Sequence, residues 1–231
     1  MVALFVALMF VGFIMLDVIV QKLEVWRAVP VAAMDSLAAA VQARGGYEKW
    51  ISVPEGVALS QGHAWAMPLQ EGAVRAGADS LVAKALDAVS RVSLPNVGDH
   101  VAAGKPLFAL ELNGRRITVS APVTGRISAV NNKLREQPGL VAQDPYGKGW
   151  VCSMEQSRPD ASSSSLHVGT KAAVWLENEV ARFQEFLTFR FTPDFALGVT
   201  SQDGGFPLPG VLAHFEPDVW AAFEREFLSQ K

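Results

Sequence analysis

The amino-acid sequence predicts a mainly β domain, a small barrel or sandwich, with one helical segment before it and a helical extension after it. Three observations predict this: short apolar runs broken by turn signals between Trp50 and Val151, a long apolar run at the N-terminus, and helical spacing of apolar residues beyond Thr170. The chain has 231 residues, 50% of them hydrophobic, which is enough for one or two domains. The formal net charge of -3 gives no support for nucleic-acid binding, which needs a clustered basic excess.

The N-terminal run from Val2 to Val20 is apolar at all but two positions. A helix of this length spans about 28 Å, close to the bilayer's hydrocarbon thickness of about 30 Å. Residues 1–22 are therefore predicted to form a single-pass transmembrane helix in contact with membrane lipid. Lys22 and Arg27 follow the run and no basic residue precedes it. The positive-inside rule then predicts an inner (cytoplasmic) membrane protein with its C-terminal bulk in the cytoplasm.

Asp17 is the charged residue within this run. A carboxylate deep in a bilayer costs about 2.5–3.5 kcal/mol on insertion scales, but Asp17 lies near the end of the run, where it can reach the headgroups. Two interpretations stay open: an interfacial residue, or a contact to a partner subunit.

The apolar run is followed by a predicted juxtamembrane helical linker, residues 23–49. Asp35 to Arg44 has the composition of a short helix, and Gly45-Gly46 ends it. Residues 50–156 are predicted as the β domain, because short strand-like runs alternate there with turn residues.

Within the domain, one helix is predicted from Asp79 to Ala88, where apolar residues recur at helical spacing. Residues 97–107 and 130–140 share apolar residues at their first, fifth and eleventh positions. This weak repeat predicts two copies of a strand-turn-strand unit, related by a pseudo-two-fold axis.

The C-terminal part is predicted as a linker, residues 157–169, and a helical extension, residues 170–231. The linker is rich in serine, and two apolar stripes at helical spacing follow it. Such stripes either pack in a core or dock a partner. The aromatic candidates for partner contact are Phe183, Phe186, Phe223 and Phe227.

Several segments resemble the H protein of the glycine cleavage system, and together they span residues 62–151 in the family's order. The most specific is DPYGKGW (144–150). The resemblance implies a barrel-sandwich hybrid fold of the lipoyl type. The matching segments are GHAW (62–65), VRAGADSLVAKALDAVSRVSLPNVGDHVAAGKPL (74–107), APVTGRISAVN (121–131) and QPGLVAQDPYGKGWV (137–151).

The same resemblance locates the family's lipoyl-attachment position. In the family, the lipoyl lysine stands at a hairpin tip, three residues after a glutamate and eight before the proline of APVTG. Counting from Glu111 and from Pro122 reaches Gly114 in both cases. Lipoylation needs a primary amine, and Gly114 has no side chain. The family's carrier chemistry is therefore not expected here.

This degenerate lipoyl-attachment hairpin contains Glu111, Asn113, Gly114, Arg115 and Arg116. Asn-Gly between two strand-like runs is a strong signal for a two-residue type I′ turn. The adjacent guanidinium groups are always protonated and cannot replace a lysine as acyl acceptor. Glu111 is expected to pair with Arg115 or Arg116 across the hairpin, an exposed contact worth under about 1 kcal/mol.

The remaining chemistry-bearing residues suggest structural roles. His63 has no second ligand at metal-binding spacing, and Cys152, the single cysteine, is expected to be a small buried residue. Nucleophile motifs, phosphate loops and paired carboxylates are not evident. The sequence therefore predicts a protein that is not an enzyme, with no cofactor and no metal.

Three functions are compatible with these features. The first is a non-catalytic, non-lipoylated accessory or scaffold subunit of a bacterial membrane complex, such as a respiratory or photosynthetic redox complex, with contacts to other subunits. The second is a lipoyl or acyl carrier related to glycine cleavage, which needs an attachment lysine elsewhere. The third is a regulatory module whose Arg115 and Arg116 receive another protein's lipoyl arm.

Overall fold

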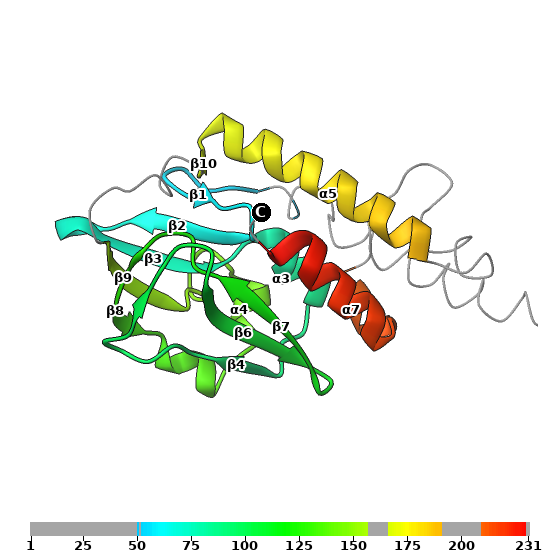
Figure 1. Ribbon diagram of the computed structural model, residues 1–231, viewed down its shortest axis with the longest axis horizontal. Helices are drawn as coiled ribbons and strands as arrows, with labels where there is room; N and C mark the ends of the chain where they lie inside the picture. Colours follow the sequence, from blue (N-terminus) through cyan, green and yellow to red (C-terminus); the bar gives the residue numbers. More distant parts are fainter. Residues whose placement is uncertain (1–49, 51, 157–165, 191–208, 230–231) are drawn as a thin grey trace, which may run out of the picture. The chain divides into compact units, whose positions relative to one another are not determined.

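The computed structural model describes residues 50, 52–156, 166–190 and 209–229, which belong to one compact unit. They form two antiparallel sheets, and the longer helices lie along one side of them (Figure 1). This architecture confirms the mainly β fold predicted from the sequence. The larger sheet contains, from edge to edge, β10 (His167–Val168), β1 (Ala58–Leu59), β2 (Ala64–Pro68), β3 (Ala73–Ala78), β9 (Cys152–Gln156), β8 (Gly125–Val130) and β5 (His100–Val101). The smaller contains β4 (Arg91–Ser93), β6 (Pro106–Leu112) and β7 (Arg115–Ser120).

In the larger sheet, the side chain of Trp65 packs on Gly77 of the neighbouring strand. Trp65 of β2 is fully buried and pairs in register with Gly77 of β3. A Cβ at residue 77 would lie 2.8 Å from Nε1 of Trp65, so only glycine fits there. The indole N–H donates to the carbonyl of Pro145, at an N···O distance of 3.1 Å. This bond ties the DPYGKGW segment to the sheet.

A short buried helix, α3 (Ser80–Leu86), follows β3. Asp79 caps it: its carboxylate accepts a hydrogen bond from the backbone N–H of Val82 at 3.1 Å. Six of its seven residues are buried, as expected of a helix that is apolar nearly all round. The helix predicted over 79–88 is therefore confirmed, with Asp79 as its N-cap. Shorter helical elements are η1 (Gln70–Gly72), η2 (Asn132–Arg135) and α4 (Leu140–Gln143).

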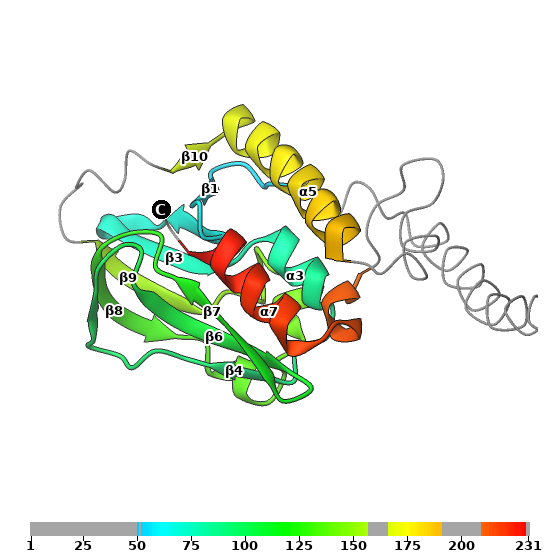
Figure 2. The same ribbon diagram turned by 45° about the vertical axis from the view of Figure 1, so that its right-hand side comes forward.

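A long helix, α5 (Thr170–Arg190), lies beside α3 (Figure 2). Its buried stripe includes Leu176, Val180 and Phe183, whereas its opposite side is exposed. The helix predicted to begin at about Thr170 is confirmed. Its apolar stripe packs against the domain itself.

The chain then returns through η4 (Val211–His214), α7 (Pro217–Phe223) and the π-helix η5 (Glu224–Leu228). Pro217 occupies the first turn of α7, where its missing N–H removes no helical bond. The indole N–H of Trp220 donates to the carbonyl of Leu212 at 2.7 Å. These elements are referred to below as the C-terminal segment, residues 210–228.

The repeat predicted from residues 97–107 and 130–140 does not form two copies of one unit. The first stretch contains β5 and the start of β6, with a turn at Gly98 (φ 97°) before β5 and a turn at Gly104 (φ 76°) between the two strands. The second ends β8 and then forms η2 and the start of α4. At the positions of the two glycines it has Asn131, with φ −81°, and Gln137, so the left-handed turns are missing.

The predicted membrane localisation is contradicted. Among the described residues, none of the helices is both long and apolar enough to cross a bilayer, and α5, the longest, has one polar side. Residues 1–22, the linker helix of 23–49 and Asp17 lie outside the described residues. So do residues 157–165 of the predicted linker, and the domain boundaries stay a prediction.

Candidate functional site

The β6–β7 hairpin has the geometry that its sequence predicts. Leu112 pairs with Arg115 across a two-residue turn. Asn113 and Gly114 both have positive φ, 52° and 75°, as a type I′ turn requires. A Cβ added at Gly114 would meet no atom within 4 Å. Gly114 therefore stands at an open hairpin tip.

The two faces of the hairpin differ. Leu110 of β6 and Ile117 of β7 pair with each other and are fully buried, so their face lines the core. Side chains alternate along strands, so Glu111 and Arg116 lie on the opposite face, which is open to solvent at their end of the hairpin and buried at Ala109. There, Glu111 pairs in register with Arg116 on one side and with Arg91 of β4 on the other. The outward face therefore carries a row of three charges, with the acidic one in the middle.

The predicted pairing of Glu111 with the hairpin arginines is wrong. Among the described residues, no ion pair joins Glu111 to Arg115 or Arg116; its carboxylate instead accepts a hydrogen bond from the hydroxyl of Ser93, at 3.4 Å. The reason is that Arg115 turns towards the C-terminal segment. Arg116 stays exposed on the outward face.

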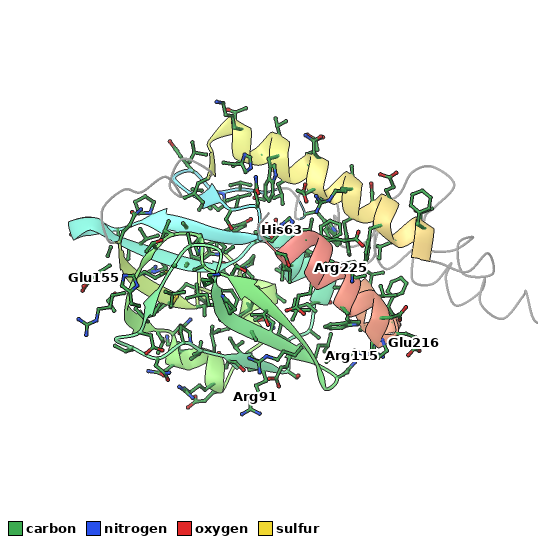
Figure 3. All side chains as sticks on the ribbon, in the orientation of Figure 1. His63, Arg91, Arg115, Glu155, Glu216 and Arg225 are labelled. Carbon is green, nitrogen blue, oxygen red and sulfur yellow. The ribbon has the colours of Figure 1, made fainter. Side chains whose placement is uncertain are left out.

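Arg115 is held by the chain's own C-terminal segment. Its guanidinium donates to the carbonyl oxygen of Phe215, lies 3.9 Å from the carboxylate of Glu216, and sits 5.8 Å from the ring centroid of Trp220. Figure 3 shows Arg115 and Glu216 next to each other at the start of α7. One of the two arginines predicted as partner contacts is thus engaged within the molecule.

The four phenylalanines predicted as partner contacts are buried within the molecule instead. They come from α5 and from the C-terminal segment, and at most 6% of any of them is exposed. Their rings form a cluster in which Phe183 meets Phe223 and Phe227 edge to face, at centroid distances of 5.4 and 5.7 Å. Their apolar area is covered by the chain itself. The buried set is Phe183, Phe186, Phe223 and Phe227.

A buried charge cluster centred on His63 joins α5 to the sheet. Nδ1 of His63 lies 2.7 Å from the carboxylate of Asp79, and Nε2 lies 3.4 Å from the carboxylate of Glu179 in α5. Glu179 also pairs with Arg182 at 2.9 Å. Burial by itself would lower the pKa of His63, but the two carboxylates outweigh it and raise the pKa to about 9. The imidazole is therefore positively charged at neutral pH, and it is fully buried, which fits the structural role expected from the sequence.

Apart from a lone histidine, no sequence pattern indicates this cluster. His63 has φ 58°, a conformation in which histidine is enriched relative to most residues. Its ring packs against Trp175 with a centroid distance of 5.1 Å. Among the described residues no group of three potential ligands could hold a metal ion. Cys152 of β9 is fully buried, and burial raises its pKa to about 12, so it is an unreactive core residue.

Comparison with known proteins finds one family. The family model "Glycine cleavage H-protein" matches residues 57–179, more than half of the chain. The glycine cleavage system H protein of Coprothermobacter proteolyticus is 34% identical over 107 residues, which is 46% of this chain and 84% of that protein. The one from Mycobacterium leprae is 35% identical over 114 residues, or 49% of this chain and 86% of that protein.

Among solved structures, the glycine cleavage system H protein from Mycobacterium marinum is 29% identical, with a TM-score of 0.47. That alignment covers 53% of this chain and 98% of the other. The family match contains both sheets, the β6–β7 hairpin and the first part of α5, and the C-terminal segment lies beyond it. On the extent of this match, the chain belongs to the glycine cleavage H-protein family.

Proposed function

We propose that this protein is a non-catalytic member of the family that carries no lipoyl group and serves as an accessory platform for protein partners. The observation that carries the proposal is Gly114. By the count from Glu111 and Pro122 it corresponds to the lipoyl lysine of the family, and it lies at the tip of a well-formed two-residue turn. A Cβ added at Gly114 would meet no atom within 4 Å, so steric crowding does not explain the absence of a side chain at the tip.

The chemistry of lipoylation supports this proposal. The modification forms an amide with a primary amine on a long, mobile side chain. No lysine occurs from Pro106 to Ser120, which covers both strands of the hairpin and its turn. Lys105 precedes β6 and is therefore at the opposite end of that strand from Gly114. Arg115 and Arg116 offer no amine that can be acylated at working pH.

Intact-mass spectrometry tests the proposal directly. The full-length protein is purified from its native host and, separately, after co-expression with a lipoate ligase. An authentic H protein is treated in parallel as the positive control. We expect the unmodified mass in both preparations of this chain. A lipoyl adduct on any lysine would refute the proposal and favour a carrier that uses a different attachment site.

We propose that the platform is the outward face of the smaller sheet, formed by β4 and the β6–β7 hairpin. Arg91 and Arg116 are both exposed there, on either side of Glu111. Exposed guanidinium groups bind carboxylates well because each can donate two parallel hydrogen bonds. A lipoyl-arm receptor that uses both hairpin arginines is disfavoured, because Arg115 is already held by Phe215 and Glu216.

Affinity purification of the full-length protein under mild conditions tests the platform. We expect a stoichiometric protein partner with the wild type and its loss with Arg91→Glu/Arg116→Glu. Arg225→Glu is the matched control, because Arg225 is also exposed but lies on η5 (Figure 3). Equal recovery of the partner with the double variant and the control would show that this face is not the platform.

A further inference from the structure

The C-terminal segment lies along the free edge of the hairpin, and this contact is outside the part of the chain that matches the family. β7 is an edge strand of the smaller sheet. The backbone N–H of Thr118 donates to the carboxylate of Glu224 at 2.8 Å. Two residues further along, the hydroxyl of Ser120 donates to the carbonyl of Leu228 at 3.4 Å. Figures 1 and 2 both show α7 running beside β7.

These bonds occupy groups that an edge strand otherwise presents to another molecule. An exposed edge offers a row of N–H and C=O groups to which a second chain can bind. Here the carboxylate of Glu224 in η5 accepts the hydrogen bond from the backbone N–H of Thr118. Next to the turn, the bond from Arg115 to Phe215 extends the contact to within one residue of Gly114.

The segment is anchored firmly on its other side. Phe223 and Phe227 are buried against Phe183 of α5. The backbone N–H of Gly210 donates to the carbonyl of Lys84 in α3 at 2.8 Å. The segment is therefore part of the packed domain, and polar bonds from Arg115, Thr118 and Ser120 join it to β7.

We propose that the C-terminal segment is a built-in cover that keeps lipoate-attaching enzymes away from the hairpin, so that the missing lysine is only one of two barriers to modification. This proposal rests on the proposed function as a non-lipoylated member of the family. In this proposal, an enzyme that acylates a side chain at the tip of the hairpin encloses the tip together with β7. Residues 215–224 already occupy that side of β7.

The experiment restores the amine and then loosens the cover, always in the full chain. Gly114→Lys is made alone, with Glu224→Ala, and with Asp218→Ala. The lysine is tolerated because its Cβ meets no atom within 4 Å, although φ 75° is unusual for it. Asp218 is the matched control, an exposed carboxylate in the first turn of α7. A lipoate ligase is added and the lipoylated fraction is followed over time by intact mass.

We expect slow modification of Gly114→Lys, the same slow rate with Asp218→Ala, and a rate about tenfold higher with Glu224→Ala. The factor follows from the loss of one hydrogen bond to a charged group, which shifts a local opening equilibrium by about that much. Hydrogen exchange checks the cover itself: the amide of Thr118 should be protected in the wild type and in Asp218→Ala, and exposed in Glu224→Ala.

Three results would overturn the cover. They are a Gly114→Lys protein modified as fast as an authentic H protein, a rate that Glu224→Ala leaves unchanged (including no modification in either), and unchanged exchange at Thr118. None of them affects the proposed function, which depends on the mass of the wild-type protein. Conversely, a lipoyl adduct on the wild type would refute the proposed function and leave the comparison of the Gly114→Lys proteins intact.

Discussion

The buried charge cluster around His63 makes stability depend on pH in a direction that can be worked out from the structure. The pKa of His63 rises from 6.5 to about 9 on folding, because Asp79 and Glu179 stabilise the charged imidazole. A raised pKa means that the folded protein holds a proton that the unfolded chain loses first. The stabilisation is therefore complete below pH 6.5 and is lost as the pH rises through 9.

The magnitude follows from the size of the shift. Each pKa unit corresponds to about 1.4 kcal/mol, so the rise to about 9 contributes about 3 kcal/mol to the free energy of unfolding. His63 is fully buried, so solvent does not screen the interaction. Between pH 6.5 and 9 the free energy of unfolding should fall by about 1.4 kcal/mol per pH unit.

Urea unfolding of the full-length protein at several pH values from 6 to 10 measures this slope. His63→Asn should remove it, since asparagine tolerates the positive φ but does not titrate. That variant also leaves the buried carboxylate of Asp79 without its cation, whereas Glu179 keeps Arg182, so it should lose about 3–5 kcal/mol. His214→Asn, at an exposed histidine, is the control and should keep the wild-type slope.

A slope that is the same in the wild type and in His63→Asn would refute the reasoning, as would a wild-type stability that is constant from pH 6.5 to 9. If His63→Asn does not fold, nuclear magnetic resonance titration of the wild-type imidazole decides the question. A midpoint at or below 6.5 would show that the carboxylates do not outweigh burial.

Three further substitutions test the packing and the turn, each by chemical denaturation against the wild type. Phe183→Ala should reduce the free energy of unfolding by about 3–5 kcal/mol, because it empties the centre of the aromatic cluster; a loss below about 1 kcal/mol would contradict that burial. Gly77→Ala should cost about 1–3 kcal/mol through the clash of its Cβ with Trp65, and a neutral result would place the indole elsewhere. Gly114→Ala should cost about 1–2 kcal/mol through backbone strain alone, so a larger loss would mean that the tip is packed.

Local signals in the sequence were enough to predict several elements. Asn113-Gly114 predicts the turn because few residue pairs accept positive φ at both positions. Apolar residues at helical spacing from Asp79 to Ala88 predict α3, and the structure adds that Asp79 caps it. In each case the residue and its partner are neighbours in the chain, so the pattern contains the whole interaction.

The contacts that decide the environment of the hairpin could not be predicted in the same way. Glu224 and Thr118 are 106 positions apart in the chain, and the sequence around either residue contains no sign of their hydrogen bond. For the same reason the local pattern predicts that Glu111 pairs with Arg115 or Arg116, although Arg115 bonds to Phe215, 100 positions away. An aromatic stripe also does not indicate what covers it, so the pattern around Phe183 leaves both a core position and a partner contact open.

The order in which the chain is made gives these distant contacts a kinetic consequence. The strand that contains Thr118 leaves the ribosome 106 residues ahead of Glu224. At 5–20 residues per second, the edge of β7 stays uncovered for about 5–20 s in every new molecule. Phe183 is synthesised before its ring partners Phe223 and Phe227, and the interval between them is shorter. Aggregation of the nascent protein should therefore be most sensitive to slow translation between the hairpin and residue 228.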